Sequence, residues 1–265
     1  MNKVFSVEKI IAENKIGFYP SLPRPLKSLI KSVLHEKQVN VILNDFQDEK
    51  NLDFINQILN YFNISINTHF KIPLEKLKRC IVVCNHPTGI LDGLILLKTL
   101  NQTHPSQMVT NDILDFVPNI KNLILPVDWL GAINKYQTRN LLNAFQSDRH
   151  IIIFPAGEVS KLRNFAIQDM EWNPSFIKKA GQFKRDIIPV RISGRNSILF
   201  YTVSTLRRLI KIDFNIEMFL LIREVFNKRN NSIKVKFGSP ISYKTLNRKK
   251  LNSEANRIKD ITNLI

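Results

Sequence analysis

The apolar positions of this sequence follow different periodicities before and after about residue 70. In residues 1–70, apolar residues recur three and four positions apart, which is the spacing of one face of a helix. This pattern predicts helices over residues 6–13, 25–36 and 52–62. We expect them to form an N-terminal helical extension, residues 1–70, that either covers a core or contacts a membrane surface.

From residue 79 onward, short runs of β-branched and aromatic residues alternate with helical stretches. The predicted strands are residues 80–84, 123–127, 151–154, 187–192 and 233–237. The predicted helices are residues 91–100, 137–147, 174–180 and 216–227. Such alternation is typical of an α/β fold in which helices connect parallel strands. We therefore expect a mixed, largely parallel sheet flanked by helices over residues 71–265, with functional groups at the carboxyl ends of strands.

Composition agrees with a folded protein and adds a strong charge asymmetry. Of the 265 residues, 44% are hydrophobic, which is enough for a sizeable core. The formal net charge is +17, and residues 161–265 alone carry 22 basic and 8 acidic residues, a net of +14. This surplus favours an anionic partner, such as nucleic acid, an anionic bilayer or an acidic carrier protein. Charge alone does not choose among them.

The sequence predicts neither a transmembrane span nor a signal peptide. No stretch approaches the roughly 18–20 apolar residues that cross a bilayer, so any membrane contact is expected at the surface. Cys80 and Cys84 lie four positions apart in one predicted strand, too far apart to form a disulfide. We expect both to be reduced and buried in a cytoplasmic protein.

The first of two chemically unusual loops follows the strand predicted at residues 80–84. It reads Asn85-His86-Pro87-Thr88-Gly89-Ile90-Leu91-Asp92-Gly93. A near-neutral imidazole suits a general base, and a carboxylate on its other nitrogen fixes the tautomer. His86 and Asp92 are therefore a candidate catalytic pair that would activate a substrate hydroxyl or amine directly. Spacing alone favours the commoner alternative, a histidine that caps a helix or bonds a loop carbonyl.

The second loop follows the strand predicted at residues 151–154 and reads Pro155-Ala156-Gly157-Glu158-Val159-Ser160. Gly157 would let a ligand approach the backbone closely. Glu158 is a candidate to bind a polar acceptor or to brace the His86 loop, although a simple turn with an exposed carboxylate fits the spacing too. Arg195, after another predicted strand, could hold a phosphate or carboxylate, or form a structural ion pair.

Together these segments resemble the glycerolipid (lysophospholipid) acyltransferase superfamily. Within it they are most similar to the hemolysin-like branch, which includes O-acyltransferases of bacterial amino-acid-containing lipids. Further segments agree in the same order: Pro126-Val127-Asp128, Thr138-Arg139-Asn140, Trp172-Asn173-Pro174-Ser175, Ile188-Pro189-Val190, Gly194-Arg195-Asn196-Ser197 and Phe237-Gly238-Ser239-Pro240-Ile241. The resemblance covers roughly residues 70–242. Five residues separate His86 from Asp92, where the superfamily usually has four, and the hemolysin-like branch tolerates this longer spacing.

The resemblance implies an acyltransferase that acts on a lyso-lipid, either a lysophospholipid or a lyso-aminolipid. His86 would deprotonate the acceptor hydroxyl, which attacks the thioester of an acyl carrier protein or of coenzyme A, and Asp92 would orient His86. The implied acceptor-binding residues are Arg139, Gly157 and Glu158, to which we add Arg195. The implied supporting residues are Asn85, Gly89, Gly93 and Pro155. No metal and no cofactor is expected, and the acyl donor is a substrate.

The resemblance also implies a peripheral protein at the cytoplasmic face of the inner membrane, on an anionic lipid surface, with no nucleic-acid partner. Two alternatives remain open from the sequence. One is N-acylation, which would give an amide that resists mild alkali. The other is a basic nucleic-acid-binding or membrane-binding protein without catalysis, which steep salt-dependent DNA binding would favour.

Overall fold

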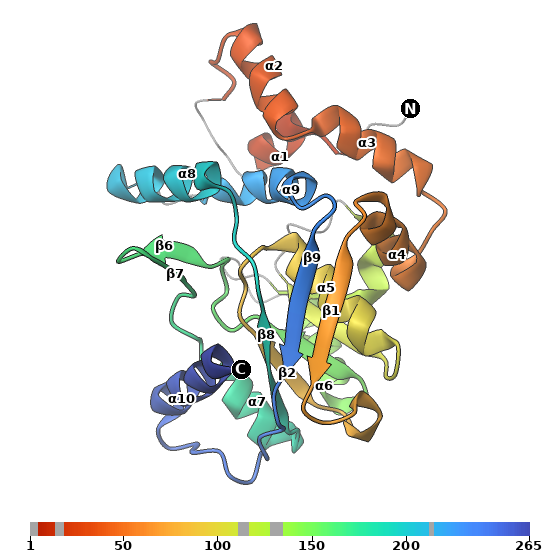
Figure 1. Ribbon diagram of the computed structural model, residues 1–265, viewed down its shortest axis with the longest axis vertical. Coiled ribbons are helices and arrows are strands. Elements are labelled where there is room, and N and C mark those ends of the chain that lie inside the picture. The colour runs from red at the N-terminus through yellow and green to blue at the C-terminus, as the bar shows by residue number, and fades with distance from the viewer. Residues whose placement is uncertain (1–4, 14–18, 111–116, 128–134, 212–214) are drawn as a thin grey trace.

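The computed structural model describes residues 5–13, 19–110, 117–127, 135–211 and 215–265. Its centre is a seven-stranded sheet of order β1-β9-β8-β2-β5-β3-β4 (Figure 1). The strands are β1 (Ser65–Phe70), β2 (Ile81–Cys84), β3 (Ser106–Thr110), β4 (Ile124–Pro126), β5 (His150–Ile153), β8 (Ile187–Ile192) and β9 (Ser232–Phe237). All neighbouring strands pair in parallel except β8 and β9. A separate antiparallel hairpin joins β6 (Lys161–Arg163) to β7 (Ala166–Gln168).

Helices cover both faces of the sheet. The helices of the described residues are α1 (Val7–Glu13), α2 (Arg24–Val33), α3 (Glu36–Asp45), α4 (Asn51–Tyr61), α5 (Ile90–Asn101), α6 (Lys135–Gln146), α7 (Ser175–Phe183), α8 (Ile198–Leu209), α9 (Glu217–Asn227) and α10 (Leu251–Leu264). Short 3-10 turns lie at Leu74–Lys76 and Pro118–Leu123.

The alternation of side chains along β2 divides the core into two layers. Val82 and Cys84 pack into one apolar cluster with residues of α4, α5 and α9. Ile81 and Val83 point to the opposite face and pack with residues of α6, α7 and α10. All four side chains are buried, because a central parallel strand has a covered layer on each side. This explains why β2 is apolar at every position rather than at every second one.

The predicted fold class is confirmed, since the sheet is mixed, mostly parallel and flanked by helices. All five predicted strands are present, and so are the four helices predicted after residue 79, with ends shifted by a few residues. Strand β3 and helices α8 and α10 were not predicted.

Two expectations for the N-terminal region are corrected by the structure. Residues 65–70 form strand β1, an edge strand paired with β9, rather than part of a helical extension. Its positions are exposed and half-buried in turn, and polar residues in four of its six positions obscure the strand pattern. The helix predicted over residues 25–36 is α2, which ends at Val33, because His35 has φ of 53° and separates it from α3, a helix that was not predicted. The division of the chain after residue 70 stays a prediction.

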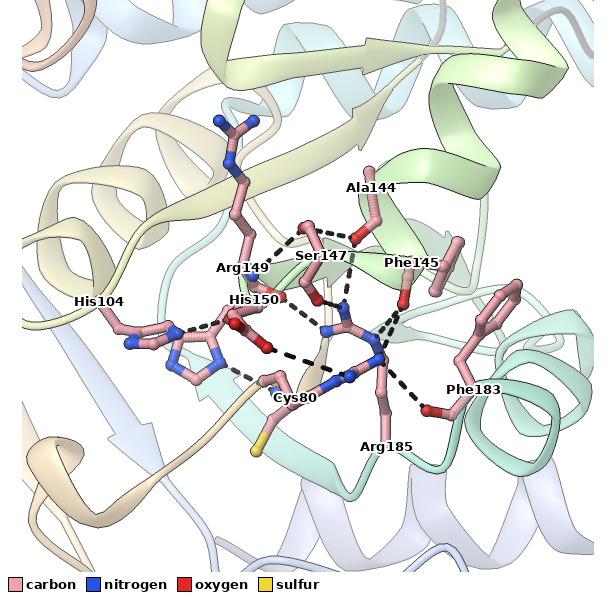
Figure 2. A network of polar contacts seen from close by, with 11 residues as sticks. Cys80, His104, Ala144, Phe145, Ser147, Arg149, His150, Phe183 and Arg185 are labelled. Atoms are coloured by element: carbon pink, nitrogen blue, oxygen red, sulfur yellow. Dashed lines mark hydrogen bonds and ion pairs between the residues drawn. The ribbon is translucent and has the colours of Figure 1, made fainter.

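The amino ends of the central strands carry a buried polar network around Arg185 (Figure 2). Arg185 is fully buried, and its guanidinium donates to the backbone carbonyls of Ala144, Phe145, Ser147 and Arg149. These carbonyls lie at the end of α6 and just beyond it, where a helix leaves its last acceptors unpaired. Burial lowers the pKa of Arg185 to about 10, which still leaves the side chain charged at neutral pH. Arg185 therefore caps α6 and attaches it to the start of β8.

His150 belongs to the same network and begins β5. Its Nδ1 accepts the backbone N–H of Cys80 at 3.0 Å, and the ring is fully buried (Figure 2). Burial, with additional repulsion from His104 and Arg185, lowers the pKa of His150 from 6.5 to about 4. Cys80 and Cys84 are both buried free thiols, as the sequence predicts, and burial raises the pKa of Cys80 to about 12.

The lowered pKa of His150 predicts a specific loss of stability in mild acid. The neutral ring contributes fully above pH 6.5, and its contribution falls as the pH drops toward about 4, because only the unfolded chain protonates freely in that window. His150→Asn keeps a side-chain acceptor that does not titrate. Between pH 7 and 4.5, the unfolding free energy of this variant should therefore fall by about 1–3 kcal/mol less than that of the wild type. Urea unfolding of both proteins measures this difference, and parallel pH profiles would contradict it.

Candidate active site

Three loops from separate parts of the chain meet at one edge of the sheet. Strands β8, β2 and β5 are neighbours and run in parallel, so their carboxyl ends lie side by side. The loops that follow them are residues 193–197, 85–89 and 154–160. The two loops that the sequence singles out for chemistry are therefore adjacent, and Arg195 lies on the third.

The carboxylate of Asp92 is the centre of this site. It lies in the first turn of α5 and is fully buried. One oxygen accepts Nδ1 of His86 at 2.9 Å and the backbone N–H groups of Thr88 and Gly89 at 2.8 and 2.9 Å. The other accepts the Thr88 hydroxyl. Four donors and the amino end of a helix thus stabilise a buried negative charge. The five residues between His86 and Asp92 include the turn that folds around this charge.

Contact with Asp92 determines which nitrogen of His86 can act as a base. A carboxylate accepts hydrogen bonds, so Nδ1 carries the proton and Nε2 holds the free lone pair. The imidazole stacks on Phe154, with ring centroids 4.0 Å apart and planes inclined by 23°. Its side chain keeps 19% of its surface exposed, which leaves an approach for a substrate.

Asp169 holds the backbone of His86 from the opposite side. Its Oδ1 accepts the His86 N–H at 3.3 Å, while the His86 carbonyl accepts the N–H of Ser160 at 2.8 Å. Asp169 also accepts the Ser160 hydroxyl and, at 3.0 Å, Nε1 of Trp172. Neither Asp169 nor Thr88 was identified from the sequence. The one available signal was the position of Asp169, three residues before the Trp172 motif.

The supporting residues of the first loop each have a geometric task. The Asn85 amide accepts the N–H of Ile192 at 2.8 Å and donates to its carbonyl at 2.9 Å, which continues the β2–β8 pairing by one residue. Gly89 has φ of 84°, and a Cβ there would lie 2.7 Å from Leu221 of α9. A Cβ at Gly93 would lie 2.6 Å from the sulfur of Met108, so its absence lets α5 approach β3.

The second loop forms a turn in which the N–H of Gly157 donates to the carbonyl of Phe154 at 3.0 Å. Gly157 has φ of 70°, and Pro155 is buried. Glu158 forms an ion pair with Lys161 and accepts Nδ2 of Asn215 at 3.2 Å. It does not itself bond the His86 loop, because Ser160 and Asp169 occupy the bonding positions on the His86 backbone. Its proposed role as an acceptor ligand stays a prediction.

Lys161 is shared between Glu158 and the buried carboxylate of Glu217. Its Nζ lies 3.1 Å from Glu217, which also pairs with Nε of Arg207 at 2.9 Å and accepts the Ser204 hydroxyl at 3.1 Å. Burial by itself would raise the pKa of Glu217, but a backbone hydrogen bond and the neighbouring Lys161 outweigh it, so the pKa is lowered. Glu217 thus stays ionised and joins segments of β6, α8 and α9.

The structure places the two candidate arginines differently. Arg195 is exposed beside the site, and its carbonyl accepts Nζ of Lys228 at 2.6 Å. Burial lowers the pKa of Lys228, while the negative charges of Glu224 and Asp92 oppose this shift. The Lys228 ammonium group is therefore close enough to Asp92 to interact with it electrostatically. Arg139 is exposed on α6, the helix that follows β4. Strand β4 lies three strands from β2, a separation of roughly 14 Å across the sheet. Asp128 lies outside the described residues.

This arrangement defines a class of enzyme. A histidine oriented by a buried carboxylate, at the carboxyl ends of parallel strands, is suited to remove a proton from a substrate group that then attacks a carbonyl. The profile of the family described as Acyltransferase matches residues 9–260, and the chain belongs to this acyltransferase family.

Individual relatives agree with this assignment. A lyso-glycine lipid O-acyltransferase of Bacteroides thetaiotaomicron is 32% identical over 97% of this chain and 96% of its own length. A protein of the same name from Phocaeicola vulgatus is 28% identical over 97% of this chain and 94% of its own length. The crystal structure of the 1-acyl-sn-glycerophosphate acyltransferase PlsC from Thermotoga maritima matches with a TM-score of 0.49 and 16% identity, covering 96% of this chain and 90% of that one. The family match and the relative at 32% identity confirm the predicted superfamily and its aminolipid branch.

Replacement of Asp92 by asparagine is expected to abolish most activity. The amide cannot accept all the donors that now face Asp92, and it does not stabilise the imidazolium that forms when His86 takes a proton. We expect kcat to fall by about 10²- to 10⁴-fold. Steady-state acyl transfer measures this, with Asp148→Asn as the matched control, because Asp148 is an exposed carboxylate (89% of its side-chain surface) at the other end of the strands. Activity within a few-fold of wild type would contradict the role of Asp92.

Proposed function

We propose that this protein transfers a fatty acyl chain from a thioester donor to the hydroxyl group of a lyso-glycine lipid. The observation that carries the proposal is the His86–Asp92 pair, with Nδ1 2.9 Å from a fully buried carboxylate and Nε2 left as the base. It occurs in a chain that is 32% identical, nearly from end to end, to a protein named for this reaction. The product would be an ester of the glycine lipid.

In the proposed reaction, Nε2 of His86 removes the proton of the acceptor hydroxyl as its oxygen attacks the thioester carbonyl. A C–O bond forms and a tetrahedral oxyanion results. When the oxyanion collapses, the C–S bond breaks and the thiolate leaves, taking the proton back from the imidazolium. Asp92 stabilises the imidazolium during this sequence and keeps its ring in position. No covalent acyl-enzyme is required.

The acceptor head group matches the charge beside the pair. A glycine that is acylated on its nitrogen keeps a free carboxylate. Arg195 is exposed on the loop after β8, and Lys228 bonds that loop from α9, so both cations lie near the carboxyl end of β2. We propose that Arg195 holds the head-group carboxylate through paired N–H donors. Gly157 and Glu158 remain candidates for the acceptor hydroxyl side, and Arg139 is the least favoured of the predicted ligands.

The donor is proposed to be acyl carrier protein or coenzyme A, and the place of reaction the cytoplasmic face of the inner membrane. None of the helices described by the structure is long and apolar enough to cross a membrane. Residues 161–265 carry a net charge of +14, which suits an acidic carrier protein and an anionic lipid surface equally. On the latter, each nearby Lys or Arg contributes about 1 kcal/mol.

Replacing His86 by alanine tests the function directly. Purified wild-type protein, supplied with a radiolabelled acyl thioester and lyso-glycine lipid, is expected to form a diacylated product that mild alkali cleaves. His86→Ala should fold normally by circular dichroism and form no product above background. His69→Ala is the matched control, since His69 is an exposed histidine on the edge strand β1. Turnover near the wild-type level in His86→Ala would overturn the assignment, and an alkali-resistant product would instead support amide formation.

A further inference from the structure

One side of the molecule exposes apolar side chains on two adjacent elements. The β6–β7 hairpin presents Leu162, Phe165 and Ile167, which are exposed by 38%, 105% and 38%. Helix α8 presents Ile198, Leu199, Leu206, Leu209 and Ile210. Figure 1 shows the hairpin and α8 projecting from the same side, and Nη2 of Arg208 donates to the carbonyl of Leu162 at 3.4 Å. We call these eight residues the apolar platform.

The tip of the hairpin is strained as well as apolar. Asn164 and Phe165 are its two turn residues, with φ of 49° and 60°. Two successive positive φ angles define a type I′ turn, in which the second position strongly favours glycine. Phe165 therefore accepts an unfavourable backbone conformation and exposes its whole ring to solvent. With its ring fully exposed, Phe165 gains no packing against the described residues that would offset this conformation, so a partner outside the chain is the physical explanation.

The side of helix α8 that faces solvent is largely apolar. Its exposed apolar residues fall within about 120° of the helix circumference. The buried side is formed by Phe200, Tyr201, Ser204 and Arg207, two of which are polar. A surface helix normally places polar residues outward. The reversed arrangement is typical of a helix that lies against an apolar phase.

Glu217 joins the two elements of the platform, the hairpin and α8. This buried carboxylate of α9 pairs with Lys161 of the hairpin and with Arg207 of α8. Its pKa is lowered, so the pairs persist at neutral pH. Glu217 therefore links the hairpin and α8, which carry the exposed apolar residues.

The hairpin and α8 carry only positive charges. Residues 161–168 and 198–211 contain no Asp or Glu. Arg208 and Lys211 are exposed, and Arg163 is half-buried beside the hairpin tip. Lys161 and Arg207 pair with two carboxylates, Glu158 and Glu217, so the other three cations account for the outward charge of the hairpin and α8. An apolar surface surrounded by basic side chains is complementary to the acyl chains and head groups of an anionic leaflet.

The hairpin also connects the platform to the catalytic histidine. Ser160 and Asp169 are the residues immediately before and after the hairpin. The Ser160 N–H bonds the His86 carbonyl, and Asp169 accepts the His86 N–H. The two ends of the hairpin thus hold the backbone of the base. A bilayer in contact with the tip would lie at a fixed position relative to His86.

We propose that the apolar platform docks on an anionic lipid bilayer and inserts the ring of Phe165 below the head groups, so that lipids of the leaflet reach His86 along the hairpin. The proposal rests on the proposed function only in taking the acceptor to be a membrane lipid. A bilayer fits better than a second copy of the chain, because the apolar residues protrude at a narrow tip and a helix edge. Charge complementarity also opposes self-association, since the two platforms would bring like charges together.

Glycine at position 165 provides a test that does not endanger the fold, because it suits the type I′ turn better than phenylalanine. Binding is measured by sedimentation with vesicles of phosphatidylcholine containing phosphatidylglycerol, in the absence of any substrate. We expect Phe165→Gly to bind at least about tenfold more weakly than wild type, without loss of thermal stability. The double variant Arg208→Gln/Lys211→Gln should lose affinity for these vesicles and retain its weaker affinity for vesicles of phosphatidylcholine alone.

Leu264→Gly is the matched control, since Leu264 is 87% exposed at the end of α10, away from the platform, and its loss should leave vesicle binding unchanged. Equal binding of wild type and Phe165→Gly would overturn the proposal. So would a loss of self-association in Phe165→Gly, by analytical ultracentrifugation, with vesicle binding unaltered. Acyl transfer is measured separately with a short-chain, water-soluble acceptor. Failure of wild type in that assay would refute the proposed function and leave the binding result to stand.

Discussion

The candidate active site depends on one buried carboxylate. Asp92 has no exposed surface, and a charge in such a place is tolerated only when donors surround it. Three of its four donors come from Thr88 and Gly89, so the turn that joins β2 to α5 folds around the charge. The fourth donor is the ring of His86. The same interaction therefore shapes the loop, begins the helix and fixes the tautomer of the base.

The surrounding sheet supplies the rigidity that this turn needs. Asn85 bonds both backbone groups of Ile192 and so extends the pairing of β2 with β8 into the loop. On the other side, Phe154 follows β5 and stacks on His86. Asp169 then holds the His86 N–H from a segment more than eighty residues further along the chain. His86 is thus positioned by contacts with segments that follow or flank three neighbouring strands of the sheet.

The sequence predicted much of this arrangement, and the omissions have a common physical cause. Strands such as β2 and β5 were found because burial on both faces leaves a continuous apolar run, and the His86 loop because its residues carry recognisable chemistry. Strand β1 was missed because an edge strand needs few apolar side chains. Asp169 and Glu217 were missed because their roles arise only when distant segments meet. The role of Arg139 as an acceptor ligand stays a prediction.

The distribution of acidic residues explains how the surface becomes more basic than the composition suggests. Among the residues that the structure describes, six carboxylates are buried: Glu36, Asp92, Asp169, Glu217, Glu224 and Glu254. They serve as internal acceptors, for backbone N–H groups in the case of Asp92 and for basic side chains in the case of Glu217. Each buried carboxylate removes negative charge from the solvent boundary, where most of the cations remain. The acidic groups that stabilise the interior are therefore groups that the surface lacks.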